Sequence, residues 1–206
     1  MTDHGDTTTV RGAQGYVNDL ARALARLDLK LLDDAIEMVA SRIREGRGVF
    51  VVGNGGSSSV AEHMACDWQA AAWQAGHGPR EISSLTENTA RITAIANDYS
   101  YEAIFEQQLV ERCHAGDLLV CLSVSGTSVN VLRAASSARE RGVAVLSLVG
   151  RPSPVSELSD LAVHLDIYGD YGLTEDLQSL FTHMVARDVR KVGAHRVPPS
   201  AQGFRR

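Results

Sequence analysis

The chain has 206 residues, of which 44% are hydrophobic and 22% charged, a balance typical of one globular domain with a proper core. Its formal net charge of -5 gives no electrostatic basis for nucleic-acid binding, and no apolar run approaches the roughly 20 residues of a membrane-spanning helix, so neither partner is expected. The three cysteines lack metal-binding spacing and indicate reduced thiols in a cytoplasmic protein.

The first predicted elements are two helices that precede the main part of the domain. Apolar residues recur with helical spacing from Tyr16 to Leu27, and Asp28 is placed to cap a second helix that closes at Gly46. Residues 1–11 and 196–206 are expected to be disordered tails. The remaining residues, 12–195, are expected to form a single domain, with 12–46 as its N-terminal helical extension.

Short strands alternate with helices in the rest of the chain. The apolar runs predict strands at 49–53, 81–85, 118–122, 143–149 and 161–167. The helical patterns lie at 58–73, 88–96, 101–113, 128–141 and 174–192. Strands that are apolar throughout and alternate with helices are typical of a parallel sheet covered on both faces. The fold class is therefore α/β, with three layers in one domain.

Two loops rich in glycine and hydroxyl side chains follow the first and third strands. Free amides and hydroxyls at the start of a helix favour anions, and ligands of such sheets bind beyond the strand ends. Each loop alone is equally well explained as a tight turn with a capping serine, but the presence of both favours a phosphorylated small molecule. Neither loop has the pattern of a dinucleotide fingerprint, a Walker loop or a nucleophile elbow. The substrate-binding candidates are Asn54, Gly55, Gly56, Ser57, Ser123, Val124, Ser125, Thr127 and Ser128.

Histidines and carboxylates recur at helical spacing near these loops. His63 and Asp67 are four residues apart, so they share a helix face and can hold one metal or act as acid and base. Glu175 and His183 are eight apart on the last predicted helix, about 12 Å along its axis. The alternatives are a histidine that satisfies a local hydrogen bond and an acid at a helix N-terminus. For His63, the neighbouring anion loop favours a functional role.

Five motifs occur in one order, and together they resemble the sugar isomerase (SIS) domain family, in its sedoheptulose-7-phosphate isomerase branch. They are Gly53-Asn54-Gly55-Gly56-Ser57, the pair His63 and Asp67, Leu85-Thr86-Glu87-Asn88, Thr93-Ala94-Ile95-Ala96-Asn97-Asp98-Tyr99 and Ser123-Val124-Ser125-Gly126-Thr127-Ser128. The resemblance spans roughly residues 15–192. It implies a flavodoxin-like five-stranded parallel sheet and a homotetramer with sites between subunits. It also implies aldose–ketose isomerisation of a seven-carbon sugar phosphate through an enediol, often with zinc in the site.

The resemblance also suggests roles for individual residues. Asp67 and His183 are the expected catalytic proton-transfer pair, and Asp98 is expected to bind sugar hydroxyls, with a turn cap as its alternative. In the family an acid or amide and a histidine stand eight apart on the terminal helix, which Glu175 and His183 match. An alternative register pairs Gln178 with Ala186 and gives an inactive protein. The expected zinc ligands are His63, Asp67, Glu175 and His183, and Glu175 is also a substrate-binding candidate.

Several departures from the family pattern leave other functions open. Asp67 stands where many members have a longer glutamate, Glu175 where many have glutamine, and Ala71 where an arginine is common. One rival is a non-catalytic SIS scaffold of the kind that binds a replication initiator, but such members lack the helix histidine and acid. Other rivals are a sugar-phosphate-sensing module and an isomerase of another ketose phosphate.

Overall fold

The structure, a computed structural model, describes residues 12–167 and 169–191 and contains one sheet of parallel strands. The sheet has five strands in the order β2-β1-β3-β4-β5, and every pairing is parallel. The chain pairs β2 on one side of β1 and then places β3 on the other, so the strand order reverses between β1 and β3. The predicted flavodoxin-like α/β fold is confirmed. The strands are β1 (Gly48–Val52), β2 (Glu81–Ser84), β3 (Leu118–Ser123), β4 (Ala144–Val149) and β5 (Leu161–His164).

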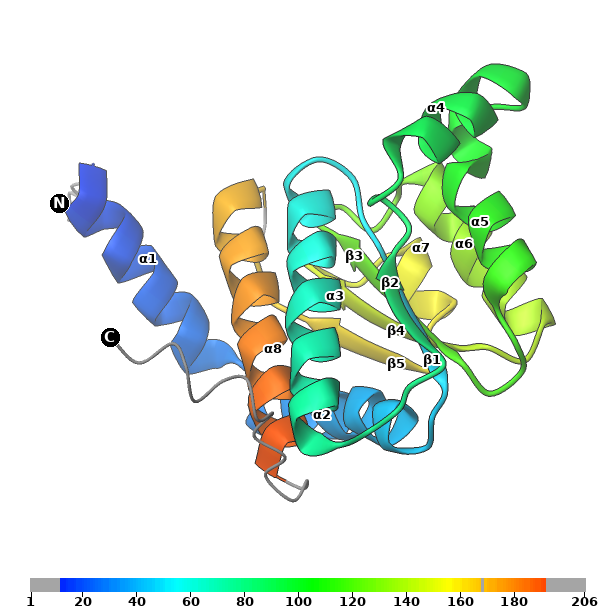
Figure 1. Cartoon of the computed structure of the whole chain (residues 1–206). Coiled ribbons are helices and arrows are strands. Elements are labelled where there is room, and N and C mark those ends of the chain that lie inside the picture. Colours follow the sequence, from blue (N-terminus) through cyan, green and yellow to red (C-terminus); the bar gives the residue numbers. More distant parts are fainter. Residues whose placement is uncertain (1–11, 168, 192–206) are drawn as a thin grey trace, which may run out of the picture.

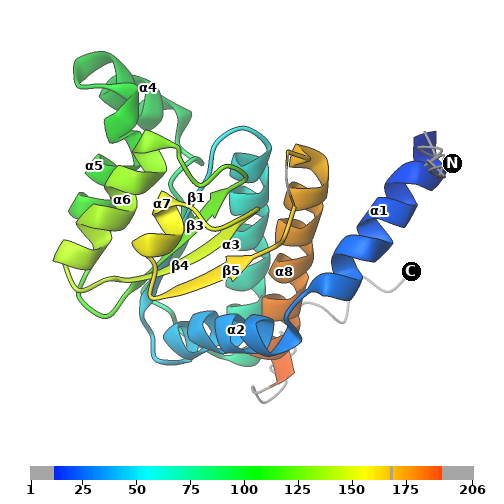
Figure 2. The ribbon, with the colours of Figure 1, turned by 180° about the vertical axis from the view of Figure 1, so that it is seen from behind.

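Helices cover both faces of this sheet (Figure 1). One face carries α2 (Leu29–Arg44), α3 (Gly56–Ala75) and α8 (Tyr171–Lys191). The other carries α4 (Thr89–Asp98), the short 3-10 helix η1 (Tyr101–Ala103), α5 (Ile104–Arg112), α6 (Val129–Glu140) and α7 (Pro154–Glu157). The first helix, α1 (Gly12–Arg26), projects from the body beside α8, as Figure 2 also shows from behind. Within the described residues, no helix combines the length and apolarity needed to cross a membrane.

The sheet separates two apolar cores. Val49 and Val51 of β1 face a cluster built from α2, α3 and α8, whereas Phe50 and Val52 face a cluster built from α4, α5 and α6. Successive strand residues point to opposite faces, so a strand covered on both sides is apolar at every position. Every residue of β1 and β3 is buried, which explains the continuous apolar runs in the sequence.

The predicted element bounds are correct to within a few residues, with three physical exceptions. The helix expected at 101–113 is divided into η1 and α5. The four-residue α7 starts at Pro154 and is too short to produce a periodic pattern. Strand β5 ends at His164 rather than 167, and Asp166 adopts a positive φ of 53° just beyond it. The predicted end of the last helix at Val192 and the predicted tails lie outside the described residues.

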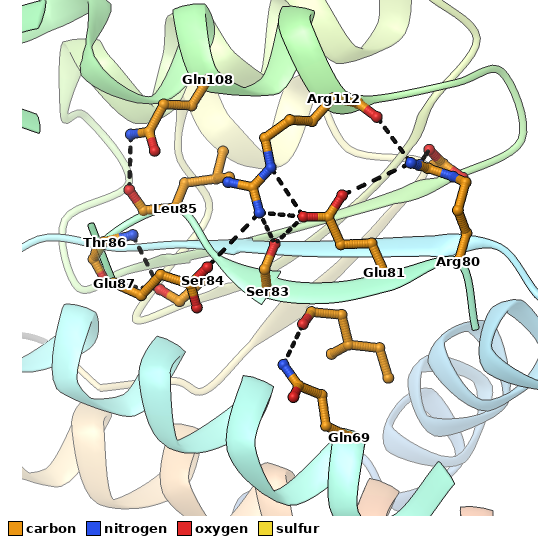
Figure 3. A network of polar contacts seen from close by, with 12 residues as sticks. Gln69, Arg80, Glu81, Ser83, Ser84, Leu85, Thr86, Glu87, Gln108 and Arg112 are labelled. Atoms are coloured by element: carbon orange, nitrogen blue, oxygen red, sulfur yellow. Dashed lines mark hydrogen bonds and ion pairs between the residues drawn. The ribbon is translucent and has the colours of Figure 1, made fainter. Parts of the chain in front are cut away.

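A polar network fixes the edge strand β2 against its neighbours (Figure 3). The Arg112 guanidinium donates to Glu81 at 2.9 Å and to Ser83 at 2.7 Å. Arg80 pairs with the buried carboxylate of Asp117, which also accepts the Gly48 amide at 2.7 Å. These contacts join the amino ends of β1, β2 and β3. They therefore hold β1 in place, and the first anion loop follows the other end of β1.

Candidate active site

The first anion loop leaves β1 and leads into α3 through close backbone contacts. A side chain at Gly53 would meet the backbone carbonyl of Ser57 at 2.7 Å, and a side chain at Gly56 would overlap the carboxylate of Glu175. Gly55 has a positive φ of 58°, which glycine adopts readily. The three glycines therefore allow α3 to begin immediately beyond the strand, with its first amides free.

The second loop, at the end of β3, holds its shape with its own hydroxyls. Ser123 accepts the Gly126 amide at 3.0 Å, and Ser125 accepts both the amide and the hydroxyl of Thr127 at 3.3 and 3.1 Å. Gly126 has a φ of 66° and lies against Ser153 at the start of α7. The loop is therefore ordered by its own hydrogen bonds, in a shape whose unbonded amides could serve as donors to an anion.

The two loops meet at one small pocket of about 140 Å³ beside the reversal point of the sheet. This volume suits a phosphoryl group better than a whole sugar, because pockets that enclose a complete small ligand hold about 300 Å³ or more. No lysine or arginine is among the described residues that line it, so an anion here would depend on neutral donors. The lining residues are Asn54, Ser57, Leu122, Ser123, Val124, Ser125, Ser128, Tyr171 and Glu175.

Most of the predicted substrate-binding residues meet in this pocket, and four do not. Gly55, Gly56 and Thr127 lie in the same loops but do not line it. Asp98 is the last residue of α4, where its exposed carboxylate accepts the Asn97 amide at 2.9 Å. In this single chain Asp98 is therefore not a lining residue of the pocket.

The histidine and acid cluster forms where α3 and α8 run side by side (Figure 1). His63 Nε2 lies 3.5 Å from an Asp67 carboxylate oxygen, and His183 Nε2 lies 3.9 Å from the same oxygen. The rings of His63 and His183 meet edge to face, with centroids 5.1 Å apart. Three side chains from two helices thus converge on one point.

Packing between α3 and α8 sets this convergence. Trp68, directly after Asp67, is fully buried and donates its indole N–H to the Thr182 carbonyl at 3.0 Å. Thr182 in turn directly precedes His183, so one buried hydrogen bond aligns the two helices at the cluster. Trp68 also contacts Phe181 edge to face. Because a buried indole N–H needs a partner, the helices are fixed against sliding.

Glu175 lies two turns away from the cluster, at the other end of the site. A metal-binding group with ligand atoms within 4.8 Å of one another contains His63, Asp67 and His183, but not Glu175. The Glu175 carboxylate lies instead against Gly56, at the N-terminus of α3. The structure thus brings together three of the four expected metal ligands and places the fourth at the phosphate pocket.

The start of α8 is electrostatically negative. The Tyr16 hydroxyl of α1 donates to Asp176 at 2.7 Å. This hydrogen bond, together with burial and the charges of Asp176, Asp170 and Glu175, raises the pKa of Tyr16 to about 12. A cation near Glu175 would offset this charge and assist the binding of an anionic ligand.

Three residues that the sequence pattern did not single out, or placed only in the alternative register, contribute to the loops. Asn130 of α6 pairs with Asn54, and Tyr101 of η1 also donates to Asn54. Buried Gln178 accepts the Ser57 hydroxyl at 3.1 Å and donates to the Leu148 carbonyl at 3.1 Å. The Ser57 proton is thus engaged, which leaves its lone pairs to accept a ligand hydroxyl.

The Ala71 position lies in the core rather than in the site. Ala71 is fully buried in the cluster of α2, α3 and α8, and Ala186 of the alternative register is also buried. Trp73, in contrast, is exposed near the far end of α3. Within one chain, therefore, neither Ala71 nor Trp73 forms a wall of the phosphate pocket.

Comparisons with known proteins identify the family of the chain. The family model "SIS domain" matches residues 15–150. The phosphoheptose isomerase of Nitratidesulfovibrio vulgaris is 36% identical over 157 residues, covering 76% of this chain and 74% of that protein. The phosphoheptose isomerase of Mycobacterium tuberculosis is 32% identical over 184 residues, covering 84% and 90%.

The same kinship appears among solved structures. Phosphoheptose isomerase GmhA from Neisseria gonorrhoeae superposes with a TM-score of 0.76 at 26% identity, covering 87% of this chain and 97% of that one. The parallel sheet, the two hydroxyl-rich loops at its reversal point and these relatives together place the chain among sugar-phosphate isomerases. The chain belongs to the SIS domain family and, within it, to the phosphoheptose isomerases.

Proposed function

We propose that the chain isomerises sedoheptulose 7-phosphate to D-glycero-D-manno-heptose 7-phosphate through an enediol. The observation that carries the proposal is the convergence of Asp67, His63 and His183 on α3 and α8, the same two helices whose first residues line a pocket of the size of a phosphoryl group. Relatives named phosphoheptose isomerase at 36% and 32% identity support the same reaction. The loop amides and hydroxyls hold the phosphate, and the sugar extends towards the cluster.

The reaction moves protons between two neighbouring carbons and needs no redox partner. In the ketose-to-aldose direction, a base removes a proton from the C1 carbon while the C2 carbonyl oxygen gains one, giving the enediol. Return of a proton to the C2 carbon and loss of the O1 proton give the aldose. We assign this exchange to Asp67 and His183, because they come from separate helices and reach one point from two sides.

Zinc fits the donor set of the cluster. Two ligand atoms on one tetrahedral zinc ion lie about 3.4 Å apart, given metal–ligand bonds of about 2.0–2.2 Å. The separations of 3.5 and 3.9 Å from Asp67 to His63 and His183 are close to this value. We propose that these three residues hold the ion and that Glu175, two turns away, is a substrate contact. A ring nitrogen of His183 bound to zinc cannot also take a proton, so with the ion bound the free carboxylate oxygen of Asp67 would carry the proton transfer. Bound zinc would polarise the substrate oxygens.

We further propose a cytoplasmic homotetramer with sites at subunit interfaces. The side chains of His63 and His183 are 43% and 59% exposed in a single chain. A reaction that must exclude water needs a more enclosed site, which a neighbouring subunit would provide. The apolar face of α1 is likewise exposed. The free thiols of Cys66, Cys113 and Cys121 support a reducing compartment.

The test is conversion of sedoheptulose 7-phosphate followed by NMR, with other ketose phosphates in parallel. We expect Asp67→Asn and His183→Ala each to lower turnover by about 10²–10⁴-fold without changing the circular dichroism spectrum, because each removes a proton-transfer group. His164→Ala is the matched control, since His164 is exposed and contacts Ser156 outside the site.

Different outcomes separate the competing functions. Full activity in either site variant would refute the assignment of the proton-transfer pair. An inactive wild-type chain that still binds the sugar phosphate would favour the sensing module. Activity with a different ketose phosphate alone would identify another isomerase, and assays with a chelator report whether the metal is required.

A further inference from the structure

Two asparagines join the anion loops by a reciprocal pair of hydrogen bonds. Asn54, just after β1, donates its side-chain amide to Asn130 at 2.9 Å. Asn130, in the first turn of α6, donates back to the Asn54 oxygen at 2.9 Å. The residues are 76 positions apart in the chain, and Asn130 is only 2% exposed. The pair therefore joins the loop that follows β1 to the helix that follows the second loop.

Further donors complete the bonding of both side-chain oxygens. The Tyr101 hydroxyl donates to the Asn54 oxygen at 3.0 Å, and the Val131 amide donates to the Asn130 oxygen at 2.9 Å. Each oxygen thus has two donors, its usual capacity. The second N–H of the Asn54 side-chain amide makes no hydrogen bond with the described residues, and Asn54 itself lines the phosphate pocket.

We propose that Asn130 and Tyr101 are positioning residues that orient the Asn54 side chain for the substrate. With its oxygen and one N–H engaged, Asn54 can offer the ligand only a donor, so it recognises a carbonyl, hydroxyl or phosphate oxygen. The inference rests on the proposed function, since it needs a sugar phosphate in this pocket. Tyr101 also links Asn54 to the segment of Asp98, because η1 begins three residues after Asp98.

An Asn130→Asp variant tests the orientation with almost no change in volume. A carboxylate at this position accepts the Asn54 N–H but cannot donate to the Asn54 oxygen, so the Asn54 amide loses its fixed orientation. The protonated acid restores that donor, and burial favours the neutral form at moderately acidic pH. Activity lost at pH 8 should therefore return as the pH falls.

The measured quantity is the kcat/KM of each variant divided by that of the wild type at the same pH, which removes the titration of the catalytic groups. For Asn130→Asp we expect a loss of about 10- to 100-fold at pH 8, most of it recovered at pH 5.5. For Asn130→Leu we expect a similar loss at both pH values. For Tyr101→Phe, with a half-exposed ring, we expect a smaller loss of about 3- to 10-fold and no recovery.

Asn88→Asp is the control, because Asn88 caps α4 through its oxygen and aspartate caps equally well. We expect its ratio to stay at one at both pH values. A folded Asn130→Asp with wild-type kcat/KM at pH 8, or with an equal loss at both values, overturns the inference. If Asn130→Asp does not fold, wild-type kcat/KM in Tyr101→Phe overturns the inference instead.

Calorimetric binding of sedoheptulose 7-phosphate separates this inference from the proposed function. An inactive wild-type chain that binds the sugar refutes the reaction, and the pH-dependent affinity of Asn130→Asp then decides the positioning role. A wild-type chain that neither binds nor converts the sugar refutes both. A wild-type chain that is active, with variants unchanged, refutes the positioning role alone.

Discussion

At the residue scale, Ser147 is a buried hydroxyl without a partner. It lies in the middle of β4, paired in register with Cys121 and Ala162, and it is fully buried. Its Oγ makes no hydrogen bond with the described residues. Desolvating a hydroxyl without compensation costs about 1–3 kcal/mol in proteins. We therefore expect Ser147→Ala to leave the free energy of unfolding unchanged or to raise it by about 1 kcal/mol, measured by urea denaturation.

Thr174→Val is the matched control for this prediction. Thr174 is equally buried, but its hydroxyl donates to the Asp170 carbonyl at 2.8 Å. Removing that bond should lower the free energy of unfolding by about 0.5–1.5 kcal/mol. A Ser147→Ala protein that loses as much stability as Thr174→Val would mean that Ser147 does have a partner in solution.

Residue spacing made part of the site predictable. His63 and Asp67 are one helical turn apart, so their shared face follows from the sequence alone. The pairs Asn54–Asn130 and Ser57–Gln178 are 76 and 121 positions apart and leave no periodic signal. Spacing also could not place Glu175 at the phosphate pocket, because its contact with Gly56 depends on how α8 packs against α3.

At the element scale, a hydrogen bond at the start of α8 adds to the contacts that hold α1 to the body, which include the packing of Ala23 in the core and the ion pair of Arg26 with Asp166. Tyr16 donates to Asp176, and the pKa of Tyr16 is raised from 10.0 to about 12, mainly by this bond. Because the folded pKa is the higher one, the contribution to stability is complete below about pH 10. It is lost as the pH rises through about 12.

Tyr16→Phe should remove this pH dependence. We expect the difference in unfolding free energy between wild type and variant to be no more than about 1 kcal/mol near neutral pH, because the bond is partly exposed. That difference should shrink between pH 10 and 12, and Tyr99→Phe, at an exposed tyrosine outside α1, is the matched control. A difference that stays constant to pH 12 would contradict the assigned role.

The elements themselves were largely predictable because their patterns are local. Strands β1 and β3 are covered on both faces and therefore read as unbroken apolar runs. Helix α8 begins at Tyr171, three residues before the predicted start, because Asp170 accepts the Leu173 amide at 3.0 Å. The short α7 depends on a Ser153–Ser156 capping box rather than on apolar spacing.

At the scale of the whole molecule, the exposed face of α1 needs a partner. Tyr16, Val17 and Leu24 of this helix are 40%, 57% and 41% exposed, and Leu29 at the start of α2 is 66% exposed. Burying the remaining apolar surface would contribute on the order of 1 kcal/mol per side chain. Within the described residues nothing covers this face. In the proposed tetramer, a second copy of the chain covers this face.

The double variant Val17→Glu and Leu24→Glu tests that assembly. Two carboxylates on the apolar face should dissociate the tetramer, because each would be buried at the interface without a partner. Sedimentation should then report a smaller particle, and turnover of sedoheptulose 7-phosphate should fall with it if the sites are completed between subunits. Arg22→Gln, on an exposed arginine that pairs with Asp19 of the same helix, is the control. A double variant of unchanged mass would place the interface elsewhere, and a dissociated but fully active one would mean that each chain holds a complete site.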